Sequence, residues 1–107
     1  MEQRVQAQKD LDKLKAKAGE AAEFLLLLAN DKRLLILCEL LAVREMSVGP
    51  LAVAVDLSQS ALSQHLAKLR AEGLVETRRD SQTIFYRLSQ EVRVRRALNL
   101  LKQLFCV

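Results

Sequence analysis

Apolar side chains in the first thirty residues fall on one helical stripe. They recur at alternating spacings of four and three residues, a period that predicts a helix over about residues 4–29. The members of the stripe are Ala7, Leu11, Leu14, Ala18, Ala21, Leu25 and Leu28. The first half of this helix extends beyond any plausible core of so short a chain. We therefore expect the stripe to pack against a second subunit.

Two further helices are indicated by their starting residues. Asn30 and Asp31 are capping residue types, and they precede an apolar pattern that predicts a helix over about residues 31–43. Ser47 is another capping type and predicts a short helix over about residues 48–55.

A fourth helix is defined at both ends. Ser58 is expected to cap a helix that runs to about Glu72, and Gly73 follows where a left-handed residue commonly ends a helix. Asp56 and Leu57 make a brief turn before Ser58. This helix therefore follows the preceding one after a very short turn.

After residue 73 the apolar residues first follow the period of strands and then return to the period of a helix. Residues 74–88 alternate with the two-residue period of strands, and Asp80, Ser81 and Gln82 supply turn residues between them, so a β-hairpin with a polar tip is predicted. Apolar residues in residues 90–105 return to a helical period, which predicts a last helix.

The order of short helix, tight turn, helix and hairpin predicts a helix-turn-helix unit, whose second helix enters the major groove of DNA. Within residues 58–70, Leu62, Leu66 and Leu69 form the stripe that we expect to be buried. The outward positions hold hydrogen-bonding groups and a cation, with no acid in the first turns, as suits base edges and phosphates. Together with flanking basic groups, the expected DNA contacts are Lys32, Arg33, Gln59, Ser60, Ser63, Gln64, His65, Lys68, Arg70, Arg78 and Arg79.

Three blocks of sequence resemble the ArsR (SmtB) family of bacterial repressors. They are NDKRLLILC at residues 30–38, LSQSALSQHL at residues 57–66, and EGLVETR with IFYRLS at residues 72–78 and 84–89. The resemblance implies a mostly helical winged helix-turn-helix with a β-hairpin wing. It also implies a homodimer built from the first and last helices, and release from operator DNA, an inverted repeat, when an inducer binds. Pro50 departs from the family pattern, because related sequences often have an acidic residue there.

A metal-sensing role is not expected. A zinc site needs about four nitrogen, sulfur or oxygen ligands, whereas this chain has two Cys and one His. The segment around Cys38 lacks the paired cysteines of the metal-thiolate class, and the last helix has no His. We predict no metal and no cofactor, with the reservation that a Cys can serve as an axial haem ligand.

The two cysteines, Cys38 and Cys106, are the remaining candidates for sensing. For each cysteine alone, a structural role is as plausible as a sensing role. Cys38 would then be a small buried apolar residue and Cys106 a terminal thiol. Together they are similar to the pair in a subgroup of the family that senses reactive sulfur species. That resemblance implies thiolate attack on a persulfide or polysulfide, or reaction with an oxidant, followed by a bridge to the second thiol. The alternative is a regulator of virulence genes that activates by competing with a silencer and has no thiol switch.

Composition is consistent with these expectations. The 107 residues suit one domain over residues 1–107, and 17 Lys and Arg against 13 Asp and Glu give a net charge of +4, a mild bias toward an anionic partner. The charged N-terminus lacks a signal-peptide pattern, and no apolar run spans a membrane, so we expect a cytoplasmic protein with reduced thiols. One His and no phosphate-binding glycine loop argue against an enzyme.

Overall fold

The computed structural model describes residues 1–106. Val107, the last residue of the domain predicted over residues 1–107, lies outside the described residues. The chain divides into two compact units, residues 1–30 and the part from residue 31 onward.

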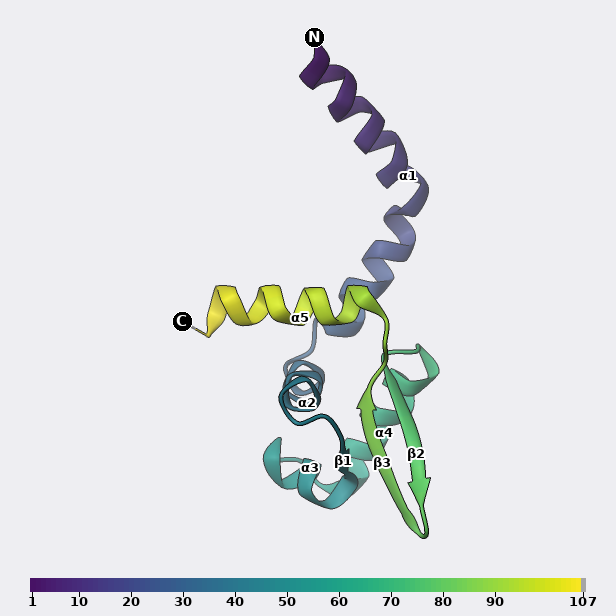
Figure 1. Cartoon of the computed structure of the whole chain (residues 1–107), viewed down its shortest axis with the longest axis vertical. Coiled ribbons are helices and arrows are strands. Elements are labelled where there is room, and N and C mark those ends of the chain that lie inside the picture. The colour runs from purple at the N-terminus through teal and green to yellow at the C-terminus, as the bar shows by residue number, and fades with distance from the viewer. Residues whose placement is uncertain (107) are drawn as a thin grey trace. The chain divides into compact units, whose positions relative to one another are not determined.

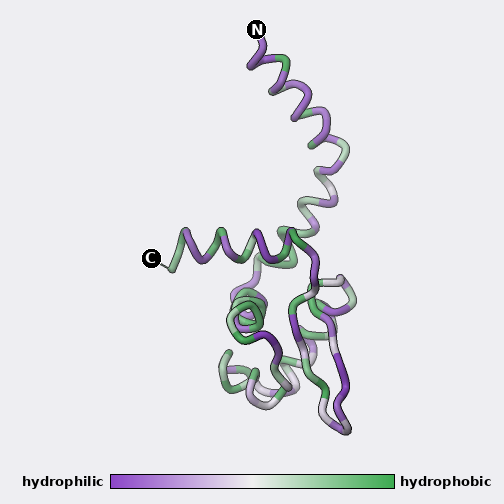
Figure 2. The backbone as a smooth tube through the Cα atoms, viewed as in Figure 1, coloured by the Kyte–Doolittle hydropathy of each residue, from purple (hydrophilic) through white to green (hydrophobic). Residues whose placement is uncertain are grey.

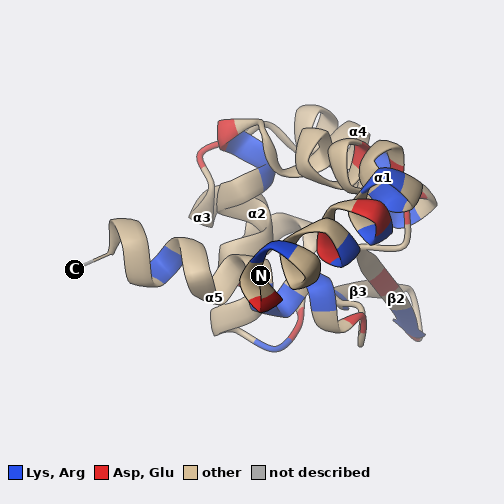
Figure 3. Cartoon of the chain, turned by 90° about the horizontal axis from the view of Figure 1, so that it is seen from above, with Lys and Arg blue, Asp and Glu red and all other residues tan. Residues whose placement is uncertain are grey.

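The first unit is helix α1 (Glu2–Leu28), which confirms the predicted helix with a start two residues earlier. Every residue from 2 to 20 is exposed, and the helix carries both basic and acidic residues (Figure 3). The apolar stripe is also exposed over most of its length, with Leu11 at 47%, Leu14 at 54% and Leu25 at 60%. Over residues 2–20 the apolar stripe of helix α1 is therefore exposed, whereas Leu28 at the end of the stripe is buried.

The second unit contains four helices and a small sheet (Figure 1). The helices begin and end within two residues of the predicted positions: α2 (Asp31–Ala42), α3 (Val48–Ala54), α4 (Gln59–Ala71) and α5 (Val92–Phe105). Each contributes apolar side chains to one core, which also takes residues from the sheet: Ile36, Leu37, Leu40, Leu51, Ala52, Val55, Leu62, Leu66, Leu69, Leu74, Val75, Leu88, Val94 and Leu98.

The turns on both sides of α4 use the residues that the sequence indicated. Asp56 has a φ of 54° and Gly73 a φ of 80°, so both lie in the left-handed region. The Ser58 hydroxyl accepts a hydrogen bond from the Ala61 backbone N–H at 3.1 Å, which satisfies one of the free donors at the start of the helix. These residues fix where α4 begins and ends.

The sheet has three antiparallel strands in the order β1-β3-β2. The predicted hairpin is confirmed: β2 (Val75–Asp80) pairs with β3 (Thr83–Leu88), and Val75 lies opposite Leu88. The hairpin extends away from α5 as a wing (Figure 1). Strand β1 (Met46–Ser47) pairs with β3 through Met46 and Tyr86 and was not predicted, because a strand of two residues is too short to show an alternating pattern.

Helix α5 begins two residues later than predicted, because Glu91 serves as its cap. The Glu91 carboxylate accepts a hydrogen bond from the Val94 N–H at 3.3 Å. Val94 and Leu98 are buried, whereas apolar residues farther along remain exposed, with Leu104 at 60% and Phe105 at 78%. The alternation of apolar and polar positions along α5 is visible in Figure 2.

Because Ser58 caps α4, its replacement is expected to lower the stability of the protein. Ser58→Ala leaves the Ala61 N–H without its acceptor, so we expect the free energy of unfolding to fall by about 1 kcal/mol. Urea denaturation followed by circular dichroism measures this change. Ser60→Ala in the same turn is the matched control, because Ser60 is exposed, and equal losses for the two variants would contradict the capping role.

Candidate nucleic-acid interface and thiol pair

One side of α4 is locked into the core. Leu62, Leu66 and Leu69 have no exposed surface, and the helix packs against α3 and β2. The predicted buried stripe is therefore confirmed. Because the leucines fix the rotation of the helix, the opposite side faces solvent, and its exposed polar residues are Gln59, Ser60, Ser63, Gln64 and Lys68.

The other residues predicted to contact DNA differ in exposure. Arg70 in the last turn of α4 and Arg79 on β2 are exposed. His65, Lys32 and Arg33 are half-buried, the last two in the first turn of α2. The exposed polar side of α4 and the wing are thus the surfaces that carry most of the predicted set.

Arg78 is already engaged by other residues of the chain. Its Nε donates hydrogen bonds to both carboxylate oxygens of Glu45, each at 2.9 Å, and its guanidinium carbon lies 4.5 Å from the centroid of the Phe85 ring. These hydrogen bonds hold the pKa of Glu45 below its ordinary value. The pair joins the segment before β1 to the wing, so Arg78 has a positioning role that the sequence did not reveal.

Glu45 was missed because its partner is distant in sequence. Arg78 and Glu45 are separated by 33 positions, and no local spacing relates them. Once the hairpin is placed, the similar pair of Arg87 and Glu76 on facing positions of β3 and β2 is easier to find, with Arg87 Nε 3.2 Å from Glu76 Oε2.

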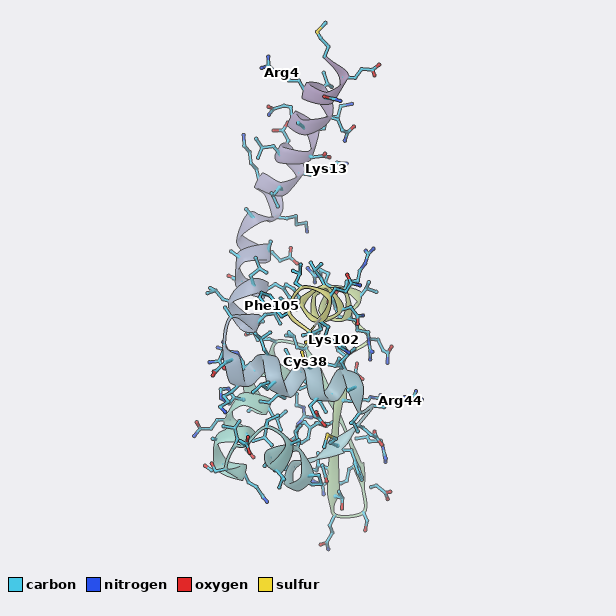
Figure 4. The ribbon with its side chains drawn as sticks, turned by 90° about the vertical axis from the view of Figure 1, so that its left-hand side faces the viewer. Arg4, Lys13, Cys38, Arg44, Lys102 and Phe105 are labelled. Carbon is cyan, nitrogen blue, oxygen red and sulfur yellow. The ribbon has the colours of Figure 1, made fainter. Side chains whose placement is uncertain are left out.

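The two thiols lie in neighbouring elements of the second unit. Cys38 is half-buried on α2, Cys106 is exposed at the end of α5, and both are free. Helices α2 and α5 pack together, and Cys38 lies on the side of α2 that faces α5 (Figure 4). The structure therefore brings together the two cysteines that the sequence singled out.

Electrostatic interactions link the two thiols. Burial raises the pKa of Cys38, the charge of Cys106 raises this pKa further, and the cation of Lys102 lowers it. Lys102 stands one helical turn before Cys106, whose backbone N–H donates to the Lys102 carbonyl at 2.8 Å. The sequence did not point to Lys102, because the thiol that it affects, Cys38, lies on another helix.

The part of the chain that the structure describes has neither a metal-site cluster nor a membrane-spanning helix. Within residues 1–106, no group of three or more His, Cys, Asp or Glu side chains is arranged to hold a metal ion. None of the helices described is both long enough and apolar enough to cross a membrane.

Comparison with known proteins gives consistent matches. The family model described as "Bacterial regulatory protein, arsR family" matches residues 30–77. The transcriptional activator HlyU of Vibrio cholerae is 47% identical over 97 residues, which are 91% of this chain and 88% of HlyU.

Solved structures give the same assignment. The structure of reduced HlyU from Vibrio cholerae matches with a TM-score of 0.81 and 47% identity, covering 89% of this chain and 98% of that one. The transcriptional repressor BigR from Xylella fastidiosa matches with a TM-score of 0.81 and 38% identity, covering 90% and 96% of the two chains. The predicted winged helix-turn-helix fold is thereby confirmed. The chain belongs to the ArsR family of bacterial regulatory proteins, in a subgroup with HlyU and BigR, and is a transcriptional regulator rather than an enzyme.

Proposed function

We propose that the protein is a homodimeric, sequence-specific repressor that binds an inverted-repeat operator and is released by thiol chemistry at Cys38 and Cys106. The observation that carries the proposal is the presence of two free thiols on packed elements, close enough for the charge of one to affect the other. The protein would act in the cytoplasm, where thiols stay reduced until a reactive sulfur species or an oxidant appears.

The exposed side of α4 supports the operator-binding part of the proposal. Gln59 and Gln64 offer amide groups that match the donor and acceptor pattern of adenine, and Lys68 can contact a phosphate. The first turn of α4 contains no acidic residue, so no carboxylate repels the DNA backbone there. Arg79 on the wing, exposed in this structure, adds a cation for the backbone.

Uncovered apolar surface supports the dimer. Helix α1 exposes Leu11, Leu14 and Leu25, and α5 exposes Leu104 and Phe105. A second copy that covers these residues would remove them from water, which stabilises association by about 25 cal/mol for each Å² buried. The resulting dimer has to hold its two α4 helices about 34 Å apart, one turn of duplex, to read both half-sites.

The proposed switch is a two-electron oxidation of the thiols. The Cys106 thiolate, which is the exposed one, attacks a sulfur of a polysulfide, whose S–S bond breaks and releases hydrosulfide. The Cys106 persulfide formed in this way is then attacked by Cys38 at the sulfur bonded to Cys106, and a second hydrosulfide leaves. Two thiols are oxidised to a disulfide while one polysulfide S–S bond is reduced to two hydrosulfides; a polysulfide that is one sulfur longer gives a trisulfide bridge and the same two hydrosulfides.

A bridge would tie α2 to the end of α5. If α5 forms part of the dimer interface, a covalent link to α2 changes the distance between the two α4 helices. A change in operator affinity of about 5- to 150-fold corresponds to a typical coupling of about 1–3 kcal/mol between two sites. One similar solved structure is of HlyU in its reduced form, which agrees with the relevance of thiol redox state.

A second candidate function has one observation in its favour. The relative HlyU is described as a transcriptional activator, so this chain would instead relieve silencing by competing for DNA, without a thiol switch. The same cysteine variants distinguish the two functions.

The exposed side of α4 predicts two different losses. Gln64→Ala removes a base-edge contact and should weaken operator binding by about 5- to 150-fold. Lys68→Ala removes one phosphate contact and should reduce the slope of log affinity against log salt concentration by about 1. Gel shifts over a salt series measure both. Gln3→Ala, the same change outside α4, should bind as wild type does. Unchanged operator affinity in the Gln64 and Lys68 variants would rule out α4 as the reading helix.

The thiol switch predicts a defined covalent product. After polysulfide treatment, mass spectrometry of the wild-type protein should show Cys38 linked to Cys106, together with weaker operator binding. Cys38→Ser and Cys106→Ser should each form no such bridge and keep their operator affinity. A bridged wild-type protein that binds the operator as before would exclude the switch, and normal gene regulation in both variants would favour the silencer-competing function.

The raised pKa of Cys38 predicts its pH dependence. A thiol with a raised pKa holds less thiolate at any given pH, so in Cys106→Ser the alkylation rate of Cys38 by iodoacetamide should rise with pH through a midpoint above that of glutathione. Adding Lys102→Gln removes the cation that lowers this pKa, so the midpoint should move higher still. A midpoint at or below the glutathione value would show that burial does not govern Cys38.

A further inference from the structure

A cavity of about 770 Å³ lies in the second unit, away from the thiols and from α4. It is bounded by the end of α2, the outer side of the wing and the beginning of α5. Its apolar lining comes from Leu40, Leu41 and Leu88. This volume falls within the range of small-molecule sites, which is about 300–1,000 Å³.

Positive charge dominates the lining of this cavity. Four arginines, Arg44, Arg78, Arg87 and Arg95, face a single carboxylate, Glu45. Arg44 extends outward from the end of α2 (Figure 4). Guanidinium groups around one cavity repel one another, and the single carboxylate in the lining cannot balance all four of them.

The four arginines differ in whether their charge is already satisfied. Arg78 is paired with Glu45 and Arg87 with Glu76. The Arg95 Nε is buried and has no hydrogen-bond partner among the residues described. A buried donor without an acceptor is costly and rare in folded proteins, so its presence at the wall of a cavity points to an acceptor that the chain itself does not supply.

We propose that this cavity binds a small organic anion that carries carboxylate or phosphate groups. Arg95 and Arg44 hold the anionic groups, because guanidinium groups form paired hydrogen bonds with planar or tetrahedral oxyanions. The leucines contact the apolar part of the ligand, and the side chain of Gln90 offers a further polar contact at the rim.

The shape of the cavity favours a free small molecule over the DNA backbone. Residues that bind backbone phosphates project from the surface toward the duplex, whereas here the arginines line a hollow together with three leucines, Glu45 and Gln90. No residue of α4 lines the cavity. The expected ligand is therefore one that enters the cavity rather than one that lies across it.

Ligand binding would bear on the wing. The Glu45–Arg78 pair forms one wall of the cavity and joins the segment before β1 to β2. An anion beside Arg44 and Arg95 repels the Glu45 carboxylate and competes for Arg78. The wing is in this way connected to the cavity through this ion pair and through Arg87 and Leu88 of β3, which also line the cavity, and no thiol takes part.

Isothermal titration of the reduced protein with citrate and with inorganic pyrophosphate, without DNA and at constant ionic strength, tests the proposal. We expect saturable binding of at least one anion. Arg95→Gln should weaken it by about tenfold or more, Arg44→Gln should also weaken it, and Arg95→Lys should restore part of it. Arg96→Gln is the matched control, because Arg96 is exposed on the same helix and does not line the cavity.

Three outcomes would overturn the proposal. The first is the absence of saturable binding of both anions to the wild-type protein, and the second is equal weakening of binding by Arg95→Gln and Arg96→Gln. The third is that the variants change only operator affinity and its salt dependence, which would make these arginines DNA contacts. Thermal melting shows whether Arg95→Gln unfolds. If it does, Arg44→Gln, a change at an exposed position, tests the proposal in its place. Because neither DNA nor a thiol takes part, failure here leaves the proposed repressor function standing.

Discussion

The burial of one side of α4 is the constraint on which the rest of the second unit depends. Leu62, Leu66 and Leu69 have no exposed surface, so α4 can neither rotate nor shift without opening the core. A helix of thirteen residues is marginal alone in water, and tertiary packing supplies its stability. The same three leucines that hold the helix also direct its polar side toward solvent, so one set of side chains determines both the packing of α4 and the surface that we propose for DNA binding.

The thiol pair and the arginine-lined cavity lie on opposite portions of α5. Arg95 belongs to the beginning of this helix and Cys106 to its end, while α2 contributes Cys38 in its middle and precedes Arg44 and Glu45. Both sites therefore bridge the same two elements at different points. The proposed bond between Cys38 and Cys106 would act at the end of α5, whereas the Glu45–Arg78 pair near its beginning connects the segment after α2 to β2.

The sequence predicted most of the fold because its signals are local. Ser58, Asp56 and Gly73 indicate the limits of α4 through backbone preferences that hold in any surroundings, and the leucine spacing indicates its buried side. Strand β1, the Glu45–Arg78 pair and the cavity depend on contacts between distant segments, and no spacing along the chain encodes them. The two cysteines were singled out by resemblance, but their mutual influence required the packing of α2 on α5.

The covering of β3 by β1 leaves β2 as the uncovered long edge of the sheet. An uncovered strand is a template onto which a strand of another molecule can add, and charged side chains discourage this. Four of the six residues of β2 are charged: Glu76, Arg78, Arg79 and Asp80. Arg79, an expected DNA contact, therefore has a second role. Together with its charged neighbours it discourages the wings of separate molecules from pairing edge to edge, which favours a protein that resists aggregation.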